Sequence, residues 1–315
     1  MTGEAAFDWH EAEKEQMDGL NTTVPHSARI WSYWQGGKDY YRIDQQVGDR
    51  VAAVFPGIGH EVRCSRYFLA RAVRYLAAEA GIRQFLDIGA GLPAADNTHA
   101  IAQRVDANCR VVYADNDPLV LAHARALLTS DRGAATGHVL ADLRDTETIL
   151  AKAHDTLDLT QPVAVILTAV LGHLPGDRDA CSAVARLMAA VPPGSYLVAS
   201  DGTDVNPAHV AAMRLYEQSG AAPYRLRSPQ QIARFFDGLE LDGPGVVPYN
   251  TWRPDPSPFD PAGTDGVGGV ARKPGPKLTR HRRGHSAEPI PAHLDLTGAP
   301  MKTCERSWRA GAAAA

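Results

Sequence analysis

An apolar run that ends in a Gly-x-Gly turn constrains this chain more than any other segment: Phe85-Leu86-Asp87-Ile88-Gly89-Ala90-Gly91-Leu92-Pro93. The run has the length and composition of a buried strand, and glycines at its end allow a ligand to approach the backbone closely. A helix that begins after such a turn offers free N–H groups to the ligand. The segment predicts a nucleotide-type site in an α/β sheet, although a tight turn that binds no ligand has the same pattern.

Between residues 65 and 273 the sequence alternates between apolar runs and helical periodicity, which predicts a doubly wound, mostly parallel sheet covered on both faces. We expect strands at 84–88, 110–114, 138–140, 163–167, 196–200 and 267–272, and one more at 239–242 or 246–249. We expect helices at about 68–80, 98–105, 118–128, 146–152, 179–191, 208–219 and 230–236.

Three regions are predicted along the chain. Residues 1–64 form an N-terminal helical lid, residues 65–273 the ligand-binding domain, and residues 274–315, rich in Pro, Gly, Ala and basic residues, a disordered tail. The formal net charge of −4 argues against a general nucleic-acid binder. The basic cluster of the tail is a candidate contact for nucleic acid or an acidic partner, with a solvated tail as the alternative. The acidic N-terminus has no signal-peptide pattern and no apolar stretch reaches the roughly 20 residues of a membrane span, so we expect a cytoplasmic protein.

Two classes of nucleotide site fit the glycine turn. The run from Gly89 to Ala94 satisfies the dinucleotide fingerprint G-x-G-x-x-G/A, which makes a nicotinamide or flavin oxidoreductase one alternative. Asp87, however, stands two residues before the first glycine, where a carboxylate would repel a pyrophosphate. A carboxylate there suits S-adenosylmethionine, which carries an ammonium and a sulfonium group. The turn therefore favours S-adenosylmethionine as the cofactor.

Two further carboxylates follow predicted strands. Asp115, in Tyr113-Ala114-Asp115-Asn116-Asp117-Pro118, is placed to accept both ribose hydroxyls, whereas Asp117 before Pro118 is the better helix cap. Asp142 is a candidate for the adenine amino group and the Leu143 backbone N–H for the adenine ring, although a turn carboxylate that caps its own backbone looks the same. Carboxyl ends of parallel strands share one edge of the sheet, so these groups should converge there.

Together with four more segments, these motifs resemble the actinobacterial S-adenosylmethionine-dependent methyltransferase family called methyltransferase type 19, over about residues 20–273. The further segments are Pro25-His26-Ser27-Ala28-Arg29-Ile30, Gln35-Gly36-Gly37-Lys38-Asp39, Ala141-Asp142-Leu143-Arg144-Asp145 and Trp252-Arg253-Pro254. The resemblance implies a class I methyltransferase (Rossmann-like) fold with a seven-stranded sheet. It also implies that Asp87, Gly89 and Gly91 lie near the methionine moiety, Asp115 at the ribose and Asp142 with Leu143 at adenine. The acceptor is left undefined.

The N-terminal stretch from Ile30 to Tyr41 is dense in aromatic residues and contains a Gly-Gly pair, which suits a lid over a cationic cofactor as well as a helix packed on the sheet. For a lid, Lys38 beside Gly37 is predicted to pair with the methionine carboxylate, and Tyr33 or Tyr40 to line the acceptor cavity. His173, after the fourth strand, is the candidate general base, although a packed histidine fits equally. The full set of predicted cofactor contacts is Gly37, Lys38, Asp87, Gly89, Ala90, Gly91, Asp115, Asn116, Asp142 and Leu143.

The sequence indicates no metal site, because its histidines and cysteines are scattered. The partners that we expect are a small-molecule methyl acceptor and, as an open alternative, a second copy of the chain in a homodimer. A protein that binds S-adenosylmethionine without catalysis is an alternative function, because a cofactor site retained beside no compelling base would look the same in sequence.

Overall fold

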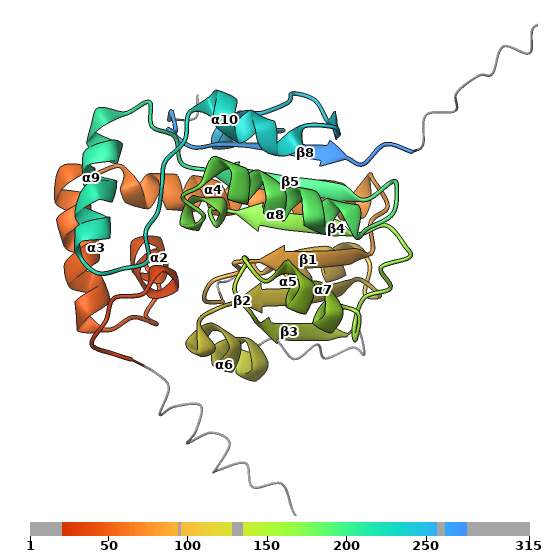
Figure 1. Ribbon diagram of the computed structural model, residues 1–315, viewed down its shortest axis with the longest axis horizontal. Helices are drawn as coiled ribbons and strands as arrows, with labels where there is room; N and C mark the ends of the chain where they lie inside the picture. Colours follow the sequence, from red (N-terminus) through yellow and green to blue (C-terminus); the bar gives the residue numbers. More distant parts are fainter. Residues whose placement is uncertain (1–20, 94–95, 128–134, 257–261, 276–315) are drawn as a thin grey trace, which may run out of the picture. The chain divides into compact units, whose positions relative to one another are not determined.

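The central sheet runs in the strand order β3–β2–β1–β4–β5–β8–β6, with β7 beside β8 (Figure 1). It is seen in a computed structural model that describes residues 21–93, 96–127, 135–256 and 262–275. The first five strands of this order are parallel, and β8 is antiparallel to β5. The strands are β1 (Gln84–Ile88), β2 (Arg110–Asp115), β3 (Thr136–Leu140), β4 (Ala164–Thr168), β5 (Tyr196–Asp201), β6 (Glu240–Leu241), β7 (Val247–Pro248) and β8 (Val267–Arg272). The predicted α/β fold is confirmed.

Helices cover both faces of the sheet, because the side chains of each strand alternate between two apolar clusters. Leu86 and Val165 pack with α7 (Thr146–Ala153), α8 (Asp177–Ala189) and α10 (Pro229–Ala233), and Phe85 and Ile166 pack on the other face with α4 (Ile58–Ala78) and α5 (Thr98–Val105). The remaining helices are α2 (Ser27–Gln35), α3 (Arg42–Val54), α6 (Pro118–Leu127) and α9 (Pro207–Gln218), with 3₁₀ turns η1 (Leu171–His173), η2 (Arg234–Phe236) and η3 (Tyr249–Thr251). The doubly wound arrangement follows from this alternation.

Both candidates for the seventh strand pair with β8, one at each of its ends. Glu240 and Leu241 of β6 pair with Arg272 and Ala271, and Val247 and Pro248 of β7 pair with Gly268 and Val267. The segment between them turns away, with a Gly243–Pro244 peptide bond in the cis form. The seventh position of the sheet is therefore one strand interrupted in its middle.

Three helices gather beyond the carboxyl ends of the parallel strands: α2, α3 and α9, at the left in Figure 1. Their contacts form a separate apolar cluster that contains Ile30, Trp34, Val51 and Met213. The helix expected at about 68–80 begins ten residues earlier as α4, at Ile58, because its amphipathic pattern starts there. The predicted boundary between lid and domain, after residue 64, falls inside this continuous helix. The division into a lid and a domain stays a prediction.

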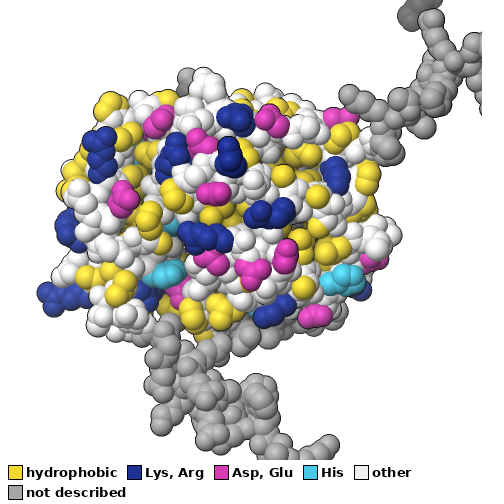
Figure 2. Space-filling model, viewed as in Figure 1, with side chains coloured by type: hydrophobic (Ala, Val, Ile, Leu, Met, Phe, Trp, Pro, Cys, Tyr) yellow, Lys and Arg dark blue, Asp and Glu magenta, His cyan; other side chains and the backbone are white. Residues whose placement is uncertain are grey.

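Some predicted features fall partly or wholly outside the described residues: Ala94 of the fingerprint, the last residue of the helix expected at 118–128, and residues 276–315 of the predicted tail. On the face shown in Figure 2, acidic and basic side chains are interspersed over the surface. Among the described residues, no helix has both the length and the apolar character needed to cross a membrane.

Candidate active site

A cleft opens at the carboxyl ends of β1, β2 and β4, and it has two adjoining lobes. The turn lobe, of about 710 Å³ with its open mouth included, is lined by the glycine turn, Arg66 on α4 and residues of α2. The edge lobe, of about 580 Å³, is lined by Asn116, Asp142 and Leu143 at the ends of β2 and β3. Both lobes share the residues Ser27, Gly89, Asp115, Val170 and His173. The predicted convergence at one sheet edge is therefore present.

Two glycines make the turn lobe possible. Gly89 has φ +72°, and a Cβ atom there would stand 2.4 Å from Cγ2 of Val170, so only glycine fits. Gly91 has φ +66°, and its N–H donates to Oδ2 of Asp115 at 2.9 Å. Opposite the turn, Ala169 also adopts a left-handed conformation, with φ +53°, which residues with a Cβ rarely do. Left-handed backbone conformations thus occur in both segments that line the turn lobe, the glycine turn and the segment after β4.

Asp115 lines both lobes and accepts a hydrogen bond from the glycine turn. Its side chain is buried, with Oδ2 accepting from Gly91 N–H and Oδ1 accepting from Asp117 N–H at 2.9 Å. Each carboxylate oxygen can accept a further hydrogen bond, so two hydroxyl groups of a ligand can bind side by side. Burial raises the pKa of Asp115, while the two backbone N–H groups oppose the rise. The fixed carboxylate is well suited to a ribose.

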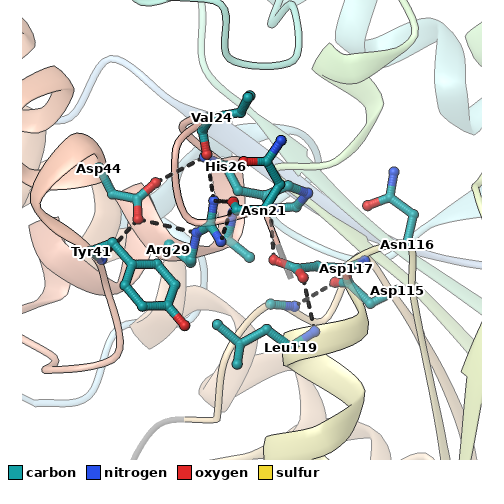
Figure 3. A network of polar contacts seen from close by, with 12 residues as sticks. Asn21, Val24, His26, Arg29, Tyr41, Asp44, Asp115, Asn116, Asp117 and Leu119 are labelled. Carbon is teal, nitrogen blue, oxygen red and sulfur yellow. Dashed lines mark hydrogen bonds and ion pairs between the residues drawn. The ribbon is translucent and has the colours of Figure 1, made fainter. Parts of the chain in front are cut away.

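Asp117 caps the N-terminus of α6 and also contacts His26 of the N-terminal segment. Its Oδ1 accepts from Leu119 N–H at 2.9 Å at the start of α6, as predicted, and its Oδ2 lies 2.9 Å from Nδ1 of His26 (Figure 3). Burial alone would raise the pKa of Asp117, but the contact with His26 brings it below its usual value. Asp117 therefore ties the N-terminal segment to the end of β2.

The edge lobe holds the third carboxylate. Asp142 accepts from Arg144 N–H at 2.8 Å, from the Arg144 guanidinium at 2.9 Å and from the Asn116 amide at 3.2 Å. Leu143 is buried beside it. The carboxylate is thus part of a polar turn as well as part of the lobe wall, and its predicted contact with the adenine amino group stays a prediction.

Asp87 is buried behind the glycine turn and is not among the residues that line either lobe. It accepts a hydrogen bond from Oγ1 of Thr98 at 2.5 Å. Burial raises the pKa of Asp87 to about 6, against the opposing effects of Thr98 and the nearby charge of Arg66. Its predicted contact with an ammonium group stays a prediction.

Arg66 is the cation on the wall of the turn lobe, and the sequence did not reveal it. Burial lowers its pKa, and the charge of Asp87 opposes this. Lys38 and Gly37, predicted for the same anionic group, are exposed and are not among the lining residues. Nothing in the sequence distinguishes Arg66 from Arg63, Arg71 or Arg74 of α4, because only the packing of the helix decides which arginine meets the turn.

Helix α2 contributes side chains both to the turn lobe and to the apolar cluster. The predicted packing of its aromatic residues is confirmed, whereas the lid over a cofactor stays a prediction. Trp31, Ser32 and Gln35 line the turn lobe, whereas Ile30 and Trp34 pack into the apolar cluster with α3 and α9. The predicted acceptor residues lie elsewhere: the Tyr33 hydroxyl donates to Asp49, and its ring packs edge-on against Tyr40. Neither tyrosine is among the residues that line a lobe.

Helices α2 and α3 are joined by a buried ion pair (Figure 3). Nε of Arg29 lies 3.1 Å from Oδ2 of Asp44, and both side chains are almost completely buried. Asp44 also accepts from the backbone N–H groups of His26 and Tyr41, each at 2.9 Å. Arg29 donates to the carbonyl oxygen of Val24 at 2.7 Å. This network fixes the segment that covers the cleft.

His173 lines both lobes, on the side where β4 ends. Its Nδ1 lies 2.8 Å from the carbonyl oxygen of Pro223. A carbonyl only accepts, so Nδ1 carries the proton and Nε2 of the neutral ring is left as a base. Burial lowers the pKa of His173, which keeps the ring neutral.

A glycine turn at the first strand, with carboxylates at the ends of the next two, is the arrangement that defines class I S-adenosylmethionine-dependent methyltransferases. The sequence model of the S-adenosyl methyltransferase family matches residues 13–274, and the chain belongs to this family. Two similar crystal structures come from Streptomyces avermitilis and Thermobifida fusca. No curated protein matches the chain.

The Streptomyces avermitilis structure is of a DUF574 family protein; it is 43% identical, covers 80% of this chain and 99% of its own, and has a TM-score of 0.77. The Thermobifida fusca structure, of a candidate methyltransferase, is 38% identical, covers 81% and 97%, and has a TM-score of 0.75. The family match supports an S-adenosylmethionine-dependent methyltransferase and not the nicotinamide or flavin oxidoreductase.

Proposed function

We propose that the cleft binds S-adenosylmethionine, with adenosine in the edge lobe and methionine in the turn lobe, and passes its methyl group to a small molecule. Asp115 carries this proposal, because its buried carboxylate lines both lobes and is oriented by the glycine turn itself. In this arrangement Asp115 accepts the ribose hydroxyls, Asp142 and Leu143 meet adenine, and Arg66 pairs with the methionine carboxylate.

The fit to the cofactor rests on the charges of the cleft. An adenosine needs acceptors for two hydroxyls and an amino group, and the edge lobe presents Asp115, Asn116 and Asp142. A pyrophosphate would meet the Asp115 carboxylate next to the turn, with Gly91 N–H already donating to it. The N–H group that a dinucleotide site would offer to phosphate is therefore engaged.

The chain's own contribution to methyl transfer is to position the two reactants and exclude water. The sulfonium of the bound cofactor supplies an already activated methyl group. The α2 side chains Trp31, Ser32 and Gln35 close the turn lobe from above. Nε2 of His173 takes the proton that an acceptor hydroxyl or amino group loses.

Isothermal titration with S-adenosylmethionine, S-adenosylhomocysteine and NAD tests the proposal. We expect the first two to bind and NAD not to bind. Asp115→Ala should weaken the binding of S-adenosylmethionine and of S-adenosylhomocysteine by roughly 5- to 150-fold. This equals the loss of about 1–3 kcal/mol from hydrogen bonds to a buried charge. The matched control is Asp155→Ala, at an exposed position after α7. Binding of NAD alone, or an unchanged affinity in Asp115→Ala, would overturn the assignment.

A further inference from the structure

A pocket of about 440 Å³, with its open mouth included, lies between α2, α4 and α9 at the carboxyl end of β5. Five aromatic side chains form much of its wall: Trp31, Trp34, Tyr216, Tyr224 and Tyr249. We call it the α9 cavity. None of the roles assigned above to the cleft uses it.

The α9 cavity adjoins the cleft. Trp31 lines both the cavity and the turn lobe. On α4, Glu61 lines the cavity, and Ser65, one turn later, lines the turn lobe. Tyr224 of the cavity wall packs edge-on against His173 of the cleft, with ring centroids 5.0 Å apart. Because β5 pairs with β4, the cavity at the end of β5 lies beside the turn lobe, where the methionine part of the cofactor is proposed to bind.

The charges around the cavity exclude an anion. Of the described residues that line it, none is Lys or Arg, and Glu61 is the one with a carboxylate. The Glu61 oxygens accept from Asp265 N–H at 2.8 Å and from Gly266 N–H at 3.1 Å. A second buried carboxylate, Asp201, accepts from the Tyr224 hydroxyl, and its Oδ2 has no hydrogen-bond partner among the described residues. A negative group on a ligand would stand beside the Glu61 carboxylate in a desolvated site, with the Asp201 carboxylate behind the Tyr224 hydroxyl.

The rest of the wall favours a flat apolar ligand. Trp31 and Trp34 meet edge-on, with ring centroids 6.5 Å apart, and Tyr216 follows at 6.3 Å from Trp34. Aromatic walls bind flat rings through offset stacking and edge contacts. His209, stacked on Phe55, contributes a neutral ring, because burial lowers its pKa to about 4.

We propose that the α9 cavity is the methyl-acceptor site and that it takes an uncharged, flat aromatic molecule with a hydroxyl or amino group. The proposal rests on the cofactor binding in the cleft. In the transfer, a lone pair of the acceptor oxygen or nitrogen forms the bond to the methyl carbon. The carbon–sulfur bond breaks with both electrons remaining on sulfur, which leaves S-adenosylhomocysteine. The acceptor's proton passes to Nε2 of His173.

Three probes with one ring skeleton test the proposal: 2-naphthol, 2-naphthoate and decahydro-2-naphthol. Their binding is measured calorimetrically on the full chain, with and without saturating S-adenosylhomocysteine. We expect 2-naphthol to bind at least tenfold more tightly than the carboxylate and more tightly than the saturated alcohol. Equal or tighter binding of 2-naphthoate, or no advantage of the aromatic ring, would overturn the proposed ligand class. This comparison needs no substitution.

A cavity-filling variant locates the binding. Met213→Trp enlarges a side chain of α9 that lines the cavity, and Leu215→Trp, the matched control, makes the same change at an exposed position of α9. We expect at least a tenfold loss of 2-naphthol affinity in Met213→Trp, with S-adenosylhomocysteine affinity within twofold of the parent, and no loss in Leu215→Trp. Unchanged 2-naphthol binding in a folded Met213→Trp would refute the location. If the parent chain binds 2-naphthol but does not bind S-adenosylhomocysteine, the result would instead refute the proposed function.

Discussion

At the scale of single residues, Arg66 and Lys38 compete for one role, the pairing with the methionine carboxylate. Arg66→Gln should weaken S-adenosylmethionine and S-adenosylhomocysteine binding by roughly 10- to 150-fold, because a hydrogen bond to a charged group contributes about 1.5–3 kcal/mol. Methylthioadenosine, which lacks the amino acid, should bind unchanged. Calorimetry on Lys38→Met and on Arg63→Gln, an exposed arginine of the same helix, completes the comparison. An equal loss in Lys38→Met would restore the role predicted from the sequence.

Asp87 makes stability depend on pH. Its pKa of about 6 in the folded chain lies above the usual value, so the folded state holds the proton more tightly than the unfolded state. Below about pH 4 both states are protonated and nothing is lost. Between about pH 4 and 6 the carboxyl ionises in the unfolded chain but keeps its proton in the folded one, so stability falls until the buried group also ionises above about pH 6. Relative to Asp87→Asn, the ligand-free parent should lose about 2 kcal/mol between pH 4 and 7.

Denaturant unfolding of the parent and of Asp87→Asn at pH 4, 5, 6 and 7 measures this difference. Comparing the two chains removes the contributions of other shifted groups, such as Asp201, whose pKa burial also raises to about 6, and His209, whose pKa is lowered. A constant difference between the two chains over this range would show that Asp87 titrates normally.

At the scale of elements, the ion pair between Arg29 and Asp44 sets how firmly α2 is held. Arg29→Met leaves the Asp44 carboxylate buried without its cation, which typically costs about 3–5 kcal/mol. We expect faster hydrogen exchange at the α2 amides, unchanged exchange in β4, and weaker S-adenosylmethionine binding, because α2 forms one wall of the turn lobe. The double variant Arg29→Met with Asp44→Asn removes the unpaired charge and should regain part of the protection. Equal acceleration in β4 would indicate global unfolding instead.

The elements also show what can be predicted from a sequence. The positions of Asp115 and Asp142 were predictable because Asp115 ends one strand and Asp142 closely follows another, and parallel strands bring their carboxyl ends together. Which face of a long helix is turned toward a site could not be predicted. Arg66 lines the turn lobe because of how α4 packs against the sheet, and the sequence does not specify that packing. Trp31 and Trp34 belong to one aromatic stretch, but their separation into a cleft wall and a packed face depends on the position of α3 and α9.

At the scale of the whole molecule, the boundary of the functional unit can be tested. The family match ends at residue 274, and the last described residue is 275. A chain that ends at Lys277 should keep the melting temperature and the S-adenosylmethionine affinity of the full chain, as measured by calorimetry. A melting temperature lowered by several degrees would show that residues 278–315 contribute to folding.

The interrupted strand at the end of the sheet has a consequence for the behaviour of the protein in concentrated solution. An uninterrupted edge strand offers a row of unpaired N–H and C=O groups on which another chain can add a strand. Here β6 and β7 are two residues long each, and Pro248 has no N–H to offer. Strand-by-strand growth into fibrils therefore finds no template on this side, and self-association would have to use other surfaces.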